Sequence, residues 1–377
     1  MREPLLVSVF ARRRRITDFT PSELDLLVRQ ARRADLLAKL CLFLKQNGQF
    51  DDIPKYARWH FTSALTITER HAVLVRYEVG LIHEALESLD TPIVILKGAA
   101  YVAANLPPAA GRLFSDIDIL VPKFDLDLVD QQLMGYGWMD NKLDAYDQRY
   151  YRRWMHELPP KKHRDRKTVL DVHHAILPET ARIHPDSKKL IAAAQPVEGF
   201  KNLFVLCPQD MILHSIVHLF HDGEFEHGLR DLLDIQGLLD HFSSSPDFWT
   251  RLLDRAQEQE LIRPLYYALH YLEKLLDADI PDHVMQSAAK LGGPSWLMIK
   301  LMDGLFSRGL LPKHASCRDA LTGLTDWMLY VRSHYLRMPP HLLVPHLYHK
   351  AFITPYLQHQ QAKKAANRVT IQDLLNR

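Results

Sequence analysis

The 377-residue chain has few cysteines, little net charge and no long hydrophobic run. Its three cysteines, Cys41, Cys207 and Cys317, lie far apart and form no CxxC pair, which argues against a disulfide framework and against a zinc ribbon. We therefore expect a reducing, cytoplasmic location. A formal net charge of +2 argues against a global field that would draw the chain to nucleic acid or to anionic membranes.

No segment is apolar enough for a transmembrane helix, so the sequence predicts no membrane insertion. The apolar residues 1–10 precede the arginines at 12–15, whereas a signal peptide has charge first and then the apolar run. Hydrophobic residues make up 47% and charged residues 24% of the chain, which is ordinary for a globular protein with a real core. The length predicts two or three domains.

The hydrophobic pattern divides the chain into three parts. Residues 1–90 have apolar residues at helical spacing, with helices expected from Pro21 and over about 68–89. Residues 91–205 alternate short β-branched runs with helical segments, which predicts a small domain with a mixed sheet. Residues 206–377 are helical again. The expected fold class is α+β, with a central mixed-sheet domain between two helical regions. Helices in the last part are expected over about 208–221, 226–241, 247–259, 262–276, 281–290, 320–337 and 370–376.

The most informative pattern is a pair of aspartates, Asp116 and Asp118, that alternate with isoleucines at the start of an apolar run. Alternate side chains on a strand point to one face, so both carboxylates aim at one spot. Neighbouring carboxylates repel unless a cation lies between them, and their oxygens suit a magnesium ion that carries a nucleotide's phosphates. Asp171, in a later predicted strand, can bring a third carboxylate to the same ion.

Residues with affinity for phosphate surround this pair in the sequence. Lys97 and Gly98 end a predicted strand over 93–96, where a glycine lets the backbone approach a phosphate and a following helix start favours anions. Arg112 can clamp a phosphate bidentately, although a structural pair with an aspartate is the alternative. Ser115 is either a nucleotide contact or, as we favour, a turn residue.

Each of the histidines has more than one interpretation. His173 lies two residues beyond Asp171, on the same face, and either contacts substrate, orients Asp171 or is an internal hydrogen-bonded side chain. His214, His218 and His221 have i, i+4 and i+7 spacing that can hold zinc, but we favour packing against the sheet domain. His218 can alternatively line a nucleotide cleft with Arg230 and Asp234. The aromatic and basic residues at 150–154 and 161–167 favour a solvated hairpin over a nucleic-acid contact.

Several of these segments together resemble a known superfamily. Gly98, the segment 112–121 with its Asp-Ile-Asp core, and the segment 170–173 are similar to the polymerase-β-like nucleotidyltransferases, in particular to a bacterial family labelled only as nucleotidyltransferase family proteins. The resemblance covers about 70–245, where 207–218 and 229–235 match the helical part of that family. It implies that Asp116 and Asp118 bind magnesium, that Asp171 is the third catalytic carboxylate, and that Gly98 forms the nucleotide-binding turn. Ala99 departs from the pattern by removing a hydroxyl that can bind phosphate.

The sequence therefore predicts a magnesium- or manganese-dependent nucleotidyltransferase. It would move an NMP group from an NTP such as ATP to a hydroxyl acceptor, with release of pyrophosphate; a small molecule, a peptide, a protein or an RNA end all fit as acceptor. One alternative is a catalytically degenerate module that binds nucleotide or a partner, which Ala99 leaves open and the three acids disfavour. Another is a DxD glycosyltransferase, which the helical segment before the motif disfavours. No pattern specifies an oligomeric state. The expected site comprises catalytic and metal-binding Asp116, Asp118 and Asp171, and nucleotide-binding Lys97, Gly98, Arg112, Ser115 and His173.

Overall fold

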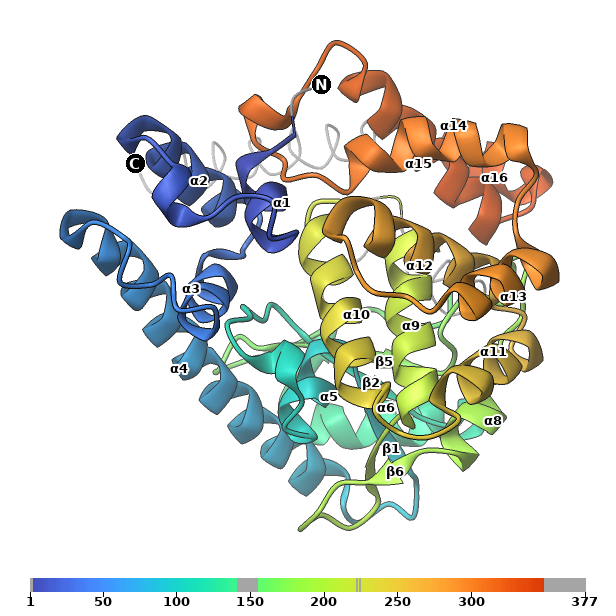
Figure 1. Ribbon diagram of the computed structural model, residues 1–377. Helices are drawn as coiled ribbons and strands as arrows, with labels where there is room; N and C mark the ends of the chain where they lie inside the picture. The colour runs from blue at the N-terminus through green and yellow to red at the C-terminus, as the bar shows by residue number, and fades with distance from the viewer. Residues whose placement is uncertain (1–2, 141–154, 222, 224, 349–377) are drawn as a thin grey trace, which may run out of the picture.

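The computed structural model describes residues 3–140, 155–221, 223 and 225–348 (Figure 1). The aromatic residues at 150–154 and the helix expected over 370–376 lie outside the described residues. Within the described part, the structure contains a seven-stranded mixed sheet, and helical regions precede and follow the sheet segment in the sequence. This arrangement confirms the predicted α+β class. None of the described helices is both long and apolar enough to cross a membrane.

The N-terminal part is helical, as expected. The helix that begins at Pro21 is capped by Thr20, whose hydroxyl accepts from the Glu23 amide while the Glu23 carboxylate accepts from the Thr20 amide. The helix expected over 68–89 is longer than predicted, because its first half carries exposed aromatic side chains such as Tyr56 and Trp59 that hide the periodic pattern. It runs along one side of the molecule (Figure 1). The helices are α1 (Leu5–Phe10), α2 (Pro21–Arg33), α3 (Leu37–Gln46) and α4 (Lys55–Leu86).

The sheet has the strand order β3-β4-β5-β2-β1-β7-β6. The strands β1 and β2 are fully buried, which is typical of a sheet covered on both faces; β1 is entirely apolar, and Asp118 is the one polar residue of β2. β2 runs antiparallel to β1 and parallel to β5, while β7 runs parallel to β1. The strands are β1 (Ile93–Leu96), β2 (Ile117–Leu120), β3 (Trp138–Asp140), β4 (Lys161–His163), β5 (Val169–His173), β6 (Gln195–Pro196) and β7 (Leu203–Val205).

Short helices connect the strands and cover the sheet. The helix α5 (Lys97–Ala103) follows β1 directly and contacts both β1 and β2. The helix α6 (Leu126–Gly135) follows β2 and contacts β3, and α4 packs on α5 and α6. The long segment between Ala99 and Asp116 is thus filled by α5 and a 3-10 turn over Pro107–Ala109. A further short helix, α8 (Ser187–Ala192), lies between β5 and β6.

The C-terminal part contains the six helices expected before residue 340 and two that the sequence analysis did not predict. The helix at 296–309 was missed because apolar side chains such as Trp296 and Leu297 are exposed and break the amphipathic pattern. The helix α15 ends just before the prolines at 339–340, as expected, but Pro340 is also the first residue of a further helix. The helices are α9 (Pro208–His221), α10 (Gly228–Phe242), α11 (Phe248–Glu258), α12 (Ile262–Leu276), α13 (Asp282–Gly292), α14 (Trp296–Gly309), α15 (Thr322–Arg337) and α16 (Pro340–Tyr348).

Buried apolar side chains from all three parts form one continuous core. Leu40 of α3, Val94 of β1 and Leu232 of α10 all belong to it and are fully buried. In Figure 1, α9 and α10 lie over the sheet, whereas α14, α15 and α16 lie at the opposite end of the view from β1 and β6. The domain boundaries near residues 90 and 205 stay a prediction.

Candidate functional site

Two central strands bring together carboxylates that are far apart in the sequence. In the paired strands β2 and β5, Asp118 is the direct neighbour of Asp171. Neighbouring residues of paired strands share a face of the sheet, so the two carboxylates lie side by side. His173 is two residues beyond Asp171 and lies on this face as well. On the other side of β2, Asp118 is opposite Leu96, the last residue of β1.

Asp118 is buried and takes part in two polar contacts. Its Oδ1 accepts a hydrogen bond from Lys97 Nζ at 2.8 Å and lies 3.0 Å from His173 Nε2. Burial alone would raise the pKa of Asp118, but attraction to Lys97 and the contact with His173 lower it well below its usual range. Asp118 is therefore ionised at neutral pH.

Lys97 is the first residue of α5 and pairs with Asp118 across the end of β1. Its φ of 48° lies in the left-handed region, which is uncommon for a residue other than glycine. This conformation turns the chain sharply from β1 into α5. Burial opposes the charge of Lys97, but Asp118 outweighs it and raises the lysine pKa above its usual value. The predicted strand-end lysine is thus part of the acidic site.

Asp116 lies immediately before β2 rather than within it, which corrects the expected strand boundary by one residue. Its Oδ1 accepts a hydrogen bond of 2.8 Å from the hydroxyl of Ser115. Asp116 is half-buried and Ser115 is exposed. The entrance to β2 is therefore the solvent-accessible edge of the site, and Asp118 is its buried end.

Asp171 differs from Asp118 in that its pKa is raised and not lowered. Its Oδ1 is buried and has no hydrogen-bond partner among the described residues. Burial, followed by repulsion from Asp118 and Glu157, raises the pKa of Asp171 to about 7. Buried polar atoms in proteins nearly always have a partner, so this oxygen marks a position where a ligand is expected.

These observations fit a divalent cation held by carboxylates. Both of these polar contacts of Asp118, with Lys97 and with His173, involve its Oδ1 atom. Its Oδ2 atom takes part in neither contact. Asp171 Oδ1 lacks a donor, and Asp116 is accessible from solvent. Oxygen ligands from two or three carboxylates are the donor set that magnesium prefers. The residues therefore match the ion that the sequence predicts.

Gly98 and Arg112 are linked by packing beneath the site. A Cβ at Gly98 would lie 3.0 Å from Phe114 Cδ1 and 3.1 Å from Arg112 Nε. The Arg112 guanidinium lies 5.8 Å and 5.7 Å from the ring centres of Tyr101 and Phe114. Its Nε is 3.3 Å from Asp234 Oδ2 on α10. Gly98 therefore leaves room for a buried arginine that has an acidic partner, and a phosphate contact of Arg112 stays a prediction.

This packing predicts the effect of a methyl group at Gly98. We expect Gly98→Ala to lower the free energy of unfolding by about 1–3 kcal/mol, because Phe114 and Arg112 must move. Gly80→Ala is the control: Gly80 lies inside α4 with no atom within 4 Å of an added Cβ, so the change should stabilise by about 0.5–1 kcal/mol. Urea unfolding of both variants measures the difference. Equal effects at the two glycines would contradict the packing role.

Two residues near the site escaped the sequence analysis, His156 and Glu157. Glu157 forms an isolated bridge with His173, and its Oε2 lies 3.4 Å from His173 Nδ1. No motif marks this segment, since it pairs with β5 outside a regular strand. His214 on α9 is buried, and burial together with the positive Lys97 keeps its pKa well below the ordinary value. The prediction that His214 packs against the sheet domain is thus consistent with its burial.

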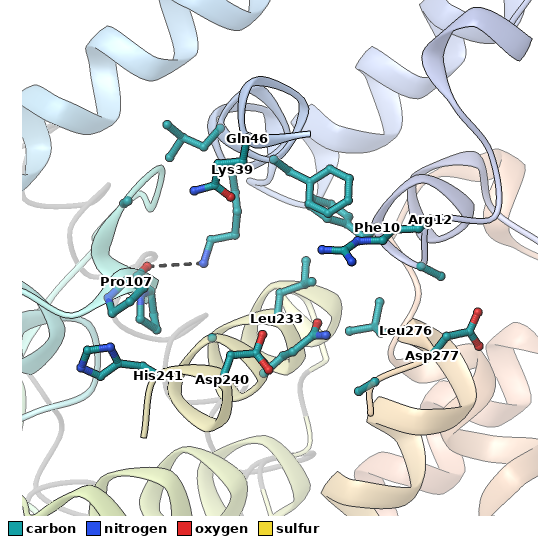
Figure 2. Close-up of a pocket in the computed structure, with 18 of the residues that line it drawn as sticks. Phe10, Arg12, Lys39, Gln46, Pro107, Leu233, Asp240, His241, Leu276 and Asp277 are labelled. Atoms are coloured by element: carbon teal, nitrogen blue, oxygen red, sulfur yellow. Dashed lines mark hydrogen bonds between the residues drawn. The ribbon is translucent and has the colours of Figure 1, made fainter. Parts of the chain in front are cut away.

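The larger hollows of the molecule lie away from the carboxylates. Figure 2 shows a cavity of about 640 Å³ whose lining includes Phe10, Lys39 and Leu233, so it lies between the N-terminal and C-terminal helices. A second, more apolar hollow of about 670 Å³ includes Phe124 and Leu177 and adjoins the segments after β2 and β5. Among the described residues, neither lining includes an aspartate of the acidic site.

The mixed sheet with these paired carboxylates agrees with the nucleotidyltransferase resemblance of the sequence. The family described as "Uncharacterised nucleotidyltransferase" matches residues 20–277, and the chain belongs to this family. The match confirms the resemblance seen in the residue pattern and extends it on both sides. One similar solved structure is an antigenic nucleotidyltransferase-like protein from Paracoccidioides brasiliensis, with 17% identity, a TM-score of 0.28, and coverage of 58% of this chain and 96% of that chain. No curated protein matches the chain.

Proposed function

We propose that the protein transfers an NMP group from an NTP to a hydroxyl-bearing acceptor and releases pyrophosphate. The observation that carries the proposal is the juxtaposition of Asp118 and Asp171 on paired strands, with one oxygen of Asp171 buried and without a donor. Membership in the nucleotidyltransferase family supports a nucleotide substrate. Asp116, two residues before Asp118, completes the carboxylate set.

We assign Asp116, Asp118 and Asp171 as the ligands of magnesium, or of manganese in its place. Such an ion, when bound, neutralises phosphate charge and orients the triphosphate for in-line attack. Asp118 is suited to this role because Lys97 and His173 hold it ionised and fix one of its oxygens. Asp116 is suited because it lies at the accessible edge, where a triphosphate can enter.

In the proposed reaction, the acceptor oxygen forms a bond to the α-phosphorus while the bond from that phosphorus to the β-bridging oxygen breaks. Pyrophosphate leaves, and the acceptor hydroxyl gives up its proton. We assign Asp171 as the group that accepts this proton, since its Oδ1 is buried beside Asp118 and has no hydrogen-bond donor among the described residues.

The remaining predicted residues support this site in two ways. Lys97, Gly98 and Ser115 lie around the aspartates, and we retain them as nucleotide contacts. We propose that His173 orients Asp118, in view of its contact with Oδ1. All three cysteines are free thiols, which agrees with a reducing compartment, and we propose a cytoplasmic location.

Calorimetry of the purified chain with each of the four NTPs tests this function. We expect binding of at least one NTP that requires magnesium, and pyrophosphate release once a lysate supplies the acceptor. Magnesium-dependent binding without pyrophosphate release in any lysate would favour the degenerate binding module instead. Preferential binding of sugar nucleotides would favour a glycosyltransferase. Absence of binding to all four NTPs in the presence of magnesium would contradict the proposal.

A further inference from the structure

Beside the aspartates lies a second group of side chains with metal-ligand chemistry, the cluster of His156, Glu157 and His173. One ligand atom from each residue lies within 4.8 Å of the others. The backbone fixes their positions, because the Leu158 amide donates to Val172 and the His174 amide donates to the His156 carbonyl at 2.8 Å. The cluster is therefore built into the edge of β5 and does not depend on flexible surface side chains.

The feature of His156 that suggests a ligand is its Nδ1 nitrogen. Its Nδ1 is buried and makes no hydrogen bond to any described residue. The His156 ring lies 5.3 Å, centre to centre, from the His173 ring. A neutral imidazole with an unused buried nitrogen is a ready metal ligand.

The two nitrogens of His173 have different neighbours. Nε2 lies 3.0 Å from Asp118 Oδ1, whereas Nδ1 lies 3.4 Å from Glu157 Oε2. When Nε2 carries the proton and donates to Asp118, Nδ1 is left with a lone pair on the side of Glu157. A histidine whose other nitrogen donates to a carboxylate is the usual arrangement around bound metals, where the carboxylate fixes the ring and raises its basicity.

We propose that His156, Glu157 and His173 bind a divalent transition metal ion of the zinc type, separate from the magnesium assigned to the aspartates. Two imidazoles and one carboxylate form a ligand set that suits zinc and leaves a coordination position open. Magnesium is disfavoured here, because it prefers oxygen ligands. Asp118 acts as the outer partner of His173 and so belongs to both sites.

The experiment uses zinc chloride with the purified, chelator-treated full-length chain. Zinc bound after gel filtration is measured by mass spectrometry, and the affinity is measured by competition with a chromogenic chelator. We expect about one tightly bound zinc per chain. His156→Ala and Glu157→Gln should weaken binding by more than about 100-fold, because loss of an outer partner alone weakens metal binding 10- to 100-fold. Asp118→Asn should fall within that smaller range.

Two control variants separate this site from its surroundings. His174→Gln changes the adjacent histidine but keeps a donor for the Met155 carbonyl, so zinc affinity should not change. Asp116→Asn removes an aspartate assigned to magnesium and should also leave zinc affinity unchanged. Zinc binding by a chain without transferase activity would support this inference while the proposed function failed.

Zinc affinity equal to the wild type in His156→Ala and in Glu157→Gln would overturn the proposal, as would a wild-type chain that retains no zinc. In that case, the two ring nitrogens of His173 would serve only to bridge the carboxylates of Asp118 and Glu157. Circular dichroism of each variant shows whether it is folded. Cobalt adds a second readout, since a wild-type cobalt spectrum of tetrahedral type should be lost in the folded Glu157→Gln variant.

Discussion

We expect Asp116→Asn to lower the rate of nucleotidyl transfer by about 1000-fold. The asparagine keeps the size of the side chain and an oxygen for the Ser115 hydroxyl, so the fold should be unaffected. The loss arises because the carboxylate helps to bind a metal ion that stabilises the transition state by several kcal/mol. Each 1.4 kcal/mol of lost stabilisation lowers the rate about tenfold. Initial rates of pyrophosphate release with a saturating lysate acceptor measure the effect.

Asp90→Asn is the matched control for this variant. Asp90 is exposed in the loop before β1, so its replacement removes the same charge from the same part of the chain without touching the site. Its activity should stay within about twofold of the wild type. If Asp116→Asn were as active as Asp90→Asn, Asp116 would not be a ligand of the catalytic ion.

Asp234→Asn should lower the free energy of unfolding by about 3–5 kcal/mol, the usual effect of removing one partner from a buried ion pair. Asp234 is 2% exposed and pairs with both Lys39 of α3 and Arg112, which packs beneath Gly98. The substitution leaves two cations in a poorly solvated interior. Chemical unfolding in urea at neutral pH measures the loss.

Asp231→Asn controls for the charge on the same helix. Asp231 pairs at 2.9 Å with one cation, the adjacent Arg230, so its loss should lower stability by less than the loss of Asp234, which pairs with two cations. Similar unfolding midpoints for the two variants would show that the ion pairs of Asp234 with Lys39 and Arg112 do not stabilise the fold. The same comparison in Arg112→Met would locate the partner responsible.

The acidic pair could be predicted from the sequence because its pattern is local. Asp118 alternates with isoleucines, and a strand has a period of two, so its place on the opposite face of β2 from Ile117 and Ile119 follows without tertiary information, whereas Asp116 lies just before the strand. The third carboxylate needed one further assumption, that the strand of Asp171 lies beside that of Asp118. The register between β2 and β5 makes the two residues direct neighbours.

The partners of these residues could not be predicted, since they come from distant segments. Arg112 has the chemistry of a phosphate ligand, and nothing nearby in the sequence identifies Asp234 as its partner. The one available signal is that Asp234 interrupts an apolar run, Leu232 to Ile235, in a helix whose face is buried. Glu157 and His156 lack even this signal, because an isolated bridge has no periodic pattern.

The central claim is that the chain transfers an NMP group, and the fate of the α-phosphorus tests it most directly. Purified protein is incubated with lysate, magnesium and ATP that is labelled at either the α- or the γ-phosphorus, and the same incubation is repeated with the NTP that binds best. We predict that the α-label enters an acceptor, that the γ-label appears in pyrophosphate, and that Asp116→Asn abolishes both. Transfer of the γ-label to an acceptor, or α-label transfer that persists in Asp116→Asn, would contradict this account.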